Sequence, residues 1–171
     1  TGVELTGCFG TFEFVEFNGF VYFNANDGSN SGGQNSELWR TDGTTAGTVL
    51  FKDNYSFGGG GPGNLVNAGT FLFFTSDNQS TTGFEPWKTD GTAGGTSMIK
   101  DIFTPGFNAG SITGDVPTAY MNGYVYFVAI DVYDASNFNL MPPQSGYINA
   151  ELWRTDGTSA NTTKVKEINP G

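Results

Sequence analysis

The chain has 171 residues with a net charge of -10, no histidine, 26 glycines and 16 phenylalanines. The acidic balance argues against nucleic acid or an anionic membrane surface as a partner. The lack of histidine excludes Ser-His-Asp and Cys-His catalysis and histidine-based metal sites. No apolar run approaches the roughly 20 residues of a membrane span, so membrane insertion is not expected. Abundant glycine and phenylalanine indicate many short strands joined by tight turns.

The first predicted unit covers roughly residues 1–56 and contains four strands. Two aromatic runs flank Asn18-Gly19, and Asn-Gly between apolar runs is the strongest short-range signal for a β-hairpin. The run after the turn is apolar at consecutive positions, which predicts a strand buried on both faces. A strand through Trp39, a tight turn and a strand at 48–52 complete the unit.

The second and third units, roughly 57–104 and 105–171, repeat this order of elements. The third unit keeps the hairpin signal as Asn122-Gly123, whereas the second has Ala68-Gly69, for which we expect a hairpin with a different turn. Pro86 replaces a leucine of the other units and removes a backbone donor. This predicts an edge strand or a bulged strand in the second unit.

One eight-residue motif, at 37–44, 85–92 and 151–158, defines the repeat and contains every tryptophan of the chain. A tryptophan at the same place in each unit favours packing between neighbouring units, and an aspartate before glycine favours a turn former. We assign these structural roles to Trp39, Trp87, Trp153, Asp42, Asp90 and Asp156. The basic residue after each tryptophan is expected to pair with the glutamates and aspartates of the repeat across strands.

Four antiparallel strands in about 48 residues are typical of one blade of a β-propeller. The sequence therefore predicts an all-β fold of three tandem four-stranded blades, with a β-trefoil as the alternative fold.

The full pattern resembles the ELWxxDGT repeat of large secreted or surface-associated bacterial proteins. Asn-Gly-x-hydrophobic-Tyr-Phe is followed by Glu-Leu-Trp-x-x-Asp-Gly-Thr, then by Lys-Asp or Lys-Glu-Ile and by Pro-Gly. The third copy departs from the Gly-Thr element, because it reads Thr158-Ser-Ala-Asn-Thr162. The resemblance implies a propeller-like array outside the cell, and it carries no established catalytic residues. We therefore expect an extracellular or cell-surface protein that is not an enzyme.

Three units are too few for a propeller ring, which typically has 4–8 blades. A fragment of a longer chain, subunits that close a ring and an open head-to-tail filament each account for this number. The leading functional hypothesis is a scaffold that self-assembles through its incomplete ends, so that its main partner is a further copy of itself.

A recurring pair of carboxylates flanks the loop that precedes each tryptophan strand. Such oxygen ligands are compatible with Ca²⁺, although no DxDxDG-type loop is present. The candidate ligands are Asp27, Asp77, Asp131, Glu37, Glu85 and Glu151. The favoured alternative is structural, with no cofactor: aspartate caps the strand end and glutamate pairs with arginine or lysine in the sheet.

An insertion at 132–150 interrupts the third unit. Insertions in repeat arrays commonly build the binding face, and the residue types here suit a carbohydrate or another surface protein. The candidate ligand-binding residues are Tyr133, Asp134, Asn137, Phe138, Asn139 and Tyr147. A carbohydrate-binding module is therefore the second functional hypothesis, and an extracellular hydrolase is the third.

Overall fold

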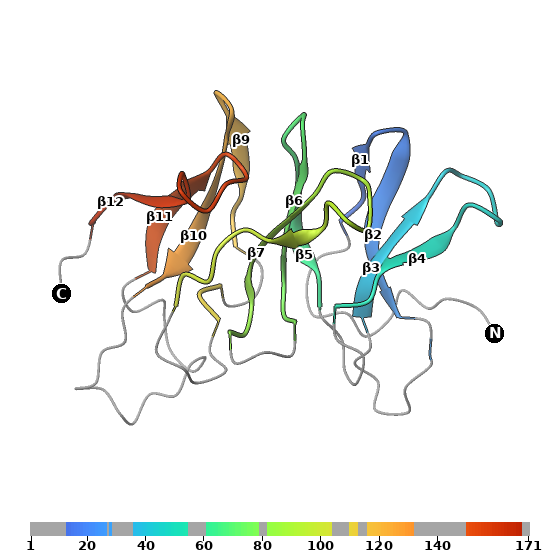
Figure 1. Ribbon diagram of the computed structural model, residues 1–171, viewed down its shortest axis with the longest axis horizontal. Helices are drawn as coiled ribbons and strands as arrows, with labels where there is room; N and C mark the ends of the chain where they lie inside the picture. Colours follow the sequence, from blue (N-terminus) through green and yellow to red (C-terminus); the bar gives the residue numbers. More distant parts are fainter. Residues whose placement is uncertain are drawn as a thin grey trace.

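The computed structural model describes residues 13–26, 28, 36–54, 61–78, 82–103, 110–112, 116–131 and 150–168. This part of the chain is all-β and contains three four-stranded antiparallel sheets that follow one another in sequence. The predicted fold class is confirmed at this level, and the three sheets stand in an open row (Figure 1). The described residues include no helix that could cross a membrane.

Each sheet is a simple meander in which every strand pairs with the next one along the chain. The first sheet comprises β1 (Val15–Phe17), β2 (Phe20–Asn26), β3 (Ser36–Thr41) and β4 (Val49–Lys52). The second comprises β5 (Gly63–Asn67), β6 (Leu72–Ser76), β7 (Glu85–Thr89) and β8 (Ser97–Met98). The third comprises β9 (Ala119–Met121), β10 (Tyr124–Ile130), β11 (Ala150–Thr155) and β12 (Thr163–Lys166).

The sheets pack against one another without sharing strands. Within the described ranges, each strand pair lies inside one unit, so the β-trefoil alternative, in which strands of different repeats share a barrel, is wrong. Strand β5 lies against both β1 and β9, while β4 and β12 lie at opposite flanks of the row (Figure 1). The first strands of the units are therefore neighbours and the last strands spread apart, as in the blades of a propeller.

The hairpin turns have the geometry that their sequences require. Asn18-Gly19 has φ values of 52° and 79°, and Asn122-Gly123 has values of 52° and 83°. Positive φ at both central residues defines a type I′ turn, which asparagine and glycine tolerate best. In the second unit the last paired residues are Asn67 and Leu72, so four residues lie between the strands instead of two, and within them the backbone N–H of Ala68 donates to the carbonyl of Phe71 over 2.9 Å. The prediction of a different turn at that place is confirmed.

The prediction of an edge or bulged strand at Pro86 is wrong. Pro86 lies in β7, an inner strand that pairs with Thr75 of β6 in regular register. The carbonyl of Pro86 accepts a hydrogen bond from Ile99 on the β8 side. Its missing N–H faces the same side, since both groups of one residue point to one neighbour in such a ladder. The proline shortens β8 to two residues, and β7 stays within the sheet.

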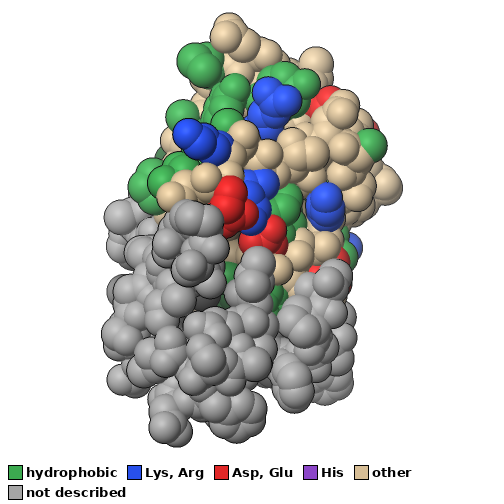
Figure 2. Space-filling model, turned by 90° about the vertical axis from the view of Figure 1, so that its left-hand side faces the viewer, with side chains coloured by type: hydrophobic (Ala, Val, Ile, Leu, Met, Phe, Trp, Pro, Cys, Tyr) green, Lys and Arg blue, Asp and Glu red, His purple; other side chains and the backbone are tan. Residues whose placement is uncertain are grey.

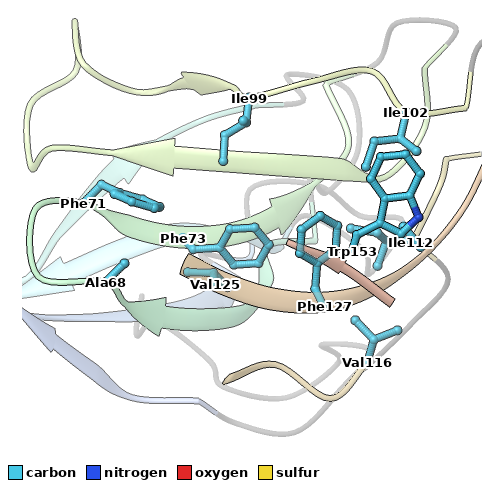
Figure 3. Close-up of a cluster of buried hydrophobic side chains, with 11 residues drawn as sticks. Ala68, Phe71, Phe73, Ile99, Ile102, Ile112, Val116, Val125, Phe127 and Trp153 are labelled. Carbon is cyan, nitrogen blue, oxygen red and sulfur yellow. The ribbon is translucent and has the colours of Figure 1, made fainter. Parts of the chain in front are cut away.

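The apolar core lies between the sheets. One cluster joins the first and second sheets and consists of Phe17, Tyr22, Leu38, Leu65, Leu72, Phe74 and Trp87. A second cluster joins the second and third sheets (Figure 3) and consists of Ala68, Phe71, Phe73, Ile99, Ile102, Ile112, Val116, Val125, Phe127, Ala129 and Trp153. Trp39 packs with Phe23 and Ala25 on the side of the first sheet that faces away from the second.

Residues 110–112 connect the second unit to the third. Ile112 donates its backbone N–H to the carbonyl of Phe84, and Ser111 accepts at its carbonyl from Ile130 of β10. Gly110 passes so close to Phe84 that an added Cβ would lie 2.0 Å from its backbone nitrogen and 2.2 Å from its oxygen. Only glycine fits at this crossing, because backbone atoms cannot rotate away as a side chain can.

We therefore expect Gly110→Ala to destabilise the protein by about 2 kcal/mol or more, because it overpacks the backbone crossing. The control is Gly94→Ala, since a Cβ at Gly94 would meet no atom within 4 Å. The control should change stability by less than about 0.5 kcal/mol or raise it slightly. Urea unfolding followed by tryptophan fluorescence measures both, and equal midpoints for the two variants would contradict the crossing.

Candidate functional site

The Asp-Gly-Thr turn is built by the same hydrogen bonds in every unit. In the first unit Asp42 Oδ1 accepts from the backbone N–H of Thr44 at 2.9 Å and from its hydroxyl at 2.7 Å. The hydroxyl groups of Thr41 and Thr48 form a hydrogen bond of 2.7 Å across the base of the turn. The hydrogen bonds from Thr44 lower the pKa of Asp42 and keep its carboxylate charged. The repeated aspartate and threonines therefore hold the turn closed.

The third turn differs from the other two at one position, where asparagine replaces glycine. A Cβ at Gly47 would lie 1.9 Å from Asp42 Oδ1, yet the equivalent residue in the third unit is Asn161. There the amide of Asn161 donates to Asp156 Oδ2 over 2.6 Å, so the asparagine becomes a partner of the aspartate. The turn keeps its bond between Thr155 and Thr162 at 2.7 Å.

The basic residue after each tryptophan reaches the turn of the next unit. Arg40 Nη1 donates to the carbonyl of Gly91 over 3.2 Å, and Lys88 Nζ donates to the carbonyl of Gly157 over 2.6 Å. The two bonds relate equivalent residues of consecutive units. Together they define a repeated contact, which we call the joint: the post-tryptophan cation of one unit and the Asp-Gly-Thr turn of the following unit. The prediction that these cations pair with glutamate and aspartate is wrong for Arg40 and Lys88.

Aromatic rings restrain the arginines that follow the first and third tryptophans. The guanidinium carbon of Arg40 lies 4.4 Å from the ring centre of Phe20 and 5.0 Å from that of Phe51. Arg154 lies in the same way over Tyr124, at 4.6 Å. Stacking on a ring restrains the long side chain and leaves its N–H groups free to point toward a neighbouring turn.

The turn glycine fits closely against the preceding unit. A Cβ at Gly157 would lie 3.0 Å from Phe71 Cε1, and one at Gly91 would lie 3.5 Å from Tyr22 Oη. Both glycines have positive φ, of 88° and 94°. Glycine therefore serves twice at this position, because it allows the turn conformation and the close approach of two units.

A second cation crosses the same interface. Lys100 Nζ donates to the carbonyl of Thr162 over 2.9 Å and lies 5.7 Å from the ring centre of Trp153. The tryptophan of the third unit thus packs under a lysine of the second. This contact ties the end of one unit to the threonine that closes the next turn.

The motif glutamates bind backbone groups instead of arginine or lysine, so that part of the prediction is also corrected. Each glutamate accepts the N–H of the residue seventeen positions later, at 2.9 to 3.0 Å; the pairs are Glu37 with Asn54, Glu85 with Ile102, and Glu151 with Ile168. A buried carboxylate in this place satisfies a backbone donor where β4, β8 or β12 has ended.

Glu85 has an additional role between units. Its carboxylate accepts from the backbone N–H of Ser111 at 2.9 Å and from the Ser111 hydroxyl at 2.6 Å. Burial raises the pKa of Glu85 to about 7, against the opposing effect of these hydrogen bonds. The carboxyl therefore anchors the segment that leads into the third unit, and it titrates near neutral pH.

The candidate calcium ligands that the structure describes do not form a group of three or more that could bind a metal ion. The described part of the chain holds no group of three or more histidine, cysteine, aspartate or glutamate side chains that could bind a metal ion. Asp131 Oδ2 forms an ion pair with Lys164 Nζ at 3.0 Å. Asp27 lies outside the described residues, as do all the candidate ligand-binding residues of the insertion, namely Tyr133, Asp134, Asn137, Phe138, Asn139 and Tyr147.

Comparison of the chain with protein-family models, with curated proteins and with solved structures found no match. The candidate site therefore rests on the geometry of the repeat itself. The feature that sequence reasoning missed is the bond from one unit to the next. Its signal was present, because the cation after tryptophan and the Asp-Gly-Thr turn recur with the same spacing in all three units.

Removing the cation of an interior joint should destabilise the fold. Lys88→Met leaves the carbonyl of the buried Gly157 without its donor, for which we expect a loss of about 1–3 kcal/mol in unfolding free energy. Lys88→Arg should retain most of the stability, because arginine makes this bond at position 40. Denaturant unfolding compares the variants, and equal losses for Met and Arg would show that the bond is not what stabilises the joint.

Glu85 should make stability depend on pH. Its pKa in the folded protein is about 7 and its ordinary value is 4.5, so between these values the folded state holds a proton that the unfolded chain has lost. The contribution of this group is therefore present below pH 4.5 and is lost as pH rises to about 7.

The loss should amount to on the order of 3 kcal/mol. Unfolding free energies across this range, compared between the parent and Glu85→Gln, measure it. The difference between the two proteins should change with pH, and a constant difference would exclude the titration.

Proposed function

We propose that this protein is a non-enzymatic β-repeat scaffold, secreted or exposed at the cell surface, that assembles by packing its terminal units against further units of the same kind. The observation that carries the proposal is a change in burial along the row of sheets. We call the side of each sheet that points toward the following unit its forward face. In the third unit this face carries Tyr124, Tyr126, Leu152, Arg154 and Val165.

Equivalent residues are covered in the interior and exposed at the end of the row. Leu38 is 0% exposed between the first and second sheets, whereas its equivalent Leu152 is 36% exposed. Ile99 is 6% exposed between the second and third sheets, whereas its equivalent Val165 is 44% exposed. A sheet face that is buried in two units and open in the third supports packing of another unit there.

Figure 2 views the molecule from the flank that carries β12 (compare Figure 1) and shows hydrophobic side chains beside lysine and arginine. Apolar side chains with a cation among them are also what the interior joints contain. The resemblance to the ELWxxDGT repeat supports an extracellular location and a role without catalysis.

The proposal is tested by the molar mass of the parent chain in solution. One chain has a mass of 18.2 kDa, and we expect a larger particle by light scattering or sedimentation at micromolar concentration. Burial of apolar area drives the association, so the particle should persist at high salt concentration, where surface ion pairs are screened. A particle of one chain under both conditions would contradict a self-assembling scaffold.

A further inference from the structure

We infer that the joint between the second and third units contains a binding site for one sugar residue of a neutral carbohydrate. The site is a cleft of about 320 Å³ that is lined by residues of both units. A ligand site of this kind goes beyond the proposed scaffold role, and it stands whether or not the protein assembles.

The cleft lies at the end of the sheets that carries the Asp-Gly-Thr turns (Figure 1). Phe71, which lines it, lies at one end of the apolar cluster between the two sheets (Figure 3). The insertion at 132–150 joins β10 and β11 at their other ends, next to the paired residues Ile130 and Ala150. The cleft is therefore on the opposite face from the loop for which the sequence predicted carbohydrate binding.

The second joint differs from the first at two paired positions. Arg40 pairs across strands with Val49, whereas Lys88 pairs with Ser97. At the first joint the guanidinium of Arg40 lies against two aromatic rings, at 4.4 and 5.0 Å. Lysine lacks this planar group, and serine is smaller than valine and carries a hydroxyl. The two exchanges remove side-chain volume and add polarity at the joint where the cleft lies.

Asp90 provides a charged acceptor at the cleft. Thr92 donates its hydroxyl to Oδ1 of Asp90 at 2.7 Å and its backbone N–H at 2.8 Å, and these bonds lower the pKa of Asp90. Among the described residues, no group donates to Oδ2 of Asp90. A Cβ at Gly95 would lie 2.2 Å from this oxygen, and Gly95 lines the cleft. The available oxygen therefore lies at the cleft wall.

The cleft also has a second carboxylate and a cation. Partial burial raises the pKa of Asp156, but the hydrogen bonds from Thr158 and Asn161 outweigh it, so the pKa is lowered and the carboxylate is charged. Lys88 Nζ donates to the carbonyl of Gly157 over 2.6 Å. An ammonium group has three N–H donors, so Lys88 can donate to a ligand as well.

This mixture of charges selects a neutral, hydroxyl-rich ligand. An anion would be repelled by Asp90 and Asp156, and a cation would be repelled by Lys88. A sugar hydroxyl can donate to a carboxylate and accept from an ammonium group, and hydrogen bonds with charged groups are the strong ones. The cleft volume is near the lower limit of ligand pockets, about 300 Å³, which suits one sugar residue with the rest of its chain outside.

Titration of the isotope-labelled parent with sugars, followed by amide chemical shifts, tests the site. The neutral probes are glucose, galactose, mannose and their disaccharides, and the charged analogues are glucosamine and glucuronate. We expect saturable shifts at Thr70, Ser97 and Gly157 with a neutral sugar, at a dissociation constant on the order of 1 mM. The charged analogues should bind more weakly.

A double variant that copies the first joint should fill the cleft. Lys88→Arg combined with Ser97→Val should weaken binding tenfold or more, because the added side-chain volume occupies the space of the ligand. The joint itself should persist, since arginine makes the equivalent bond at position 40. The matched control is Val49→Ser, the reverse exchange at the first joint, which should leave the affinity unchanged.

A single substitution tests the carboxylate. Asp90→Asn keeps an oxygen for Thr92 but removes the charge, and it should weaken binding about fivefold or more. Its control is Asp42→Asn, which makes the same change in the turn of the first unit, away from the cleft, and should leave the affinity unchanged.

The outcomes separate the site from its alternatives. The site would be overturned if no neutral sugar produced saturable shifts at the cleft residues, if the shifts were confined to other parts of the chain, or if the double variant bound as the parent does. Tighter binding of glucosamine or glucuronate would overturn a neutral ligand. The molar mass in solution tests the proposed function separately, so failure of one does not imply failure of the other.

Discussion

The fold depends on apolar contact between sheets that share no strands. Hydrogen bonds between strands build each sheet, but within the described ranges every ladder stays inside one unit. The two clusters that join the sheets therefore provide the main cohesion of the row. Burying one leucine- or phenylalanine-sized side chain contributes about 1.5–3 kcal/mol. Several such side chains at each interface outweigh the roughly 1 kcal/mol of a single hydrogen bond.

Polar contacts then decide which surfaces meet. An apolar face alone would accept many partners, whereas a cation that donates to one carbonyl accepts only a turn at a defined position. Arg40 and Lys88 set this position at the two interior joints. The glutamates act within this frame: Glu85 binds both the end of its own unit and Ser111 on the way to the next. The repeated apolar packing stabilises the contact between sheets, and the repeated polar contacts fix how neighbouring units are positioned.

Local structure could be predicted from the sequence where the conformation depends only on neighbouring residues. Asn18-Gly19 and Asn122-Gly123 predicted hairpins, because few other residues tolerate two consecutive positive φ values. Pro86 misled for a related reason. The sequence showed that Pro86 lacks a backbone N–H, but not that this position faces β8. The lost hydrogen bond therefore shortens β8, while β7, which contains the proline, keeps its length.

The sequence by itself determined the repeat, the four strands of each unit and the all-β class, since spacing and turn chemistry act over a few residues. Only the tertiary structure decided what the repeated charges of the motif do. Opposite charges predicted pairs within a sheet, whereas folding brings Arg40 and Lys88 to a carbonyl of the next unit and each motif glutamate to a backbone N–H seventeen residues later. Partners of this kind carry no sequence signature, because every residue offers the same backbone groups and only the packing of sheets selects among them.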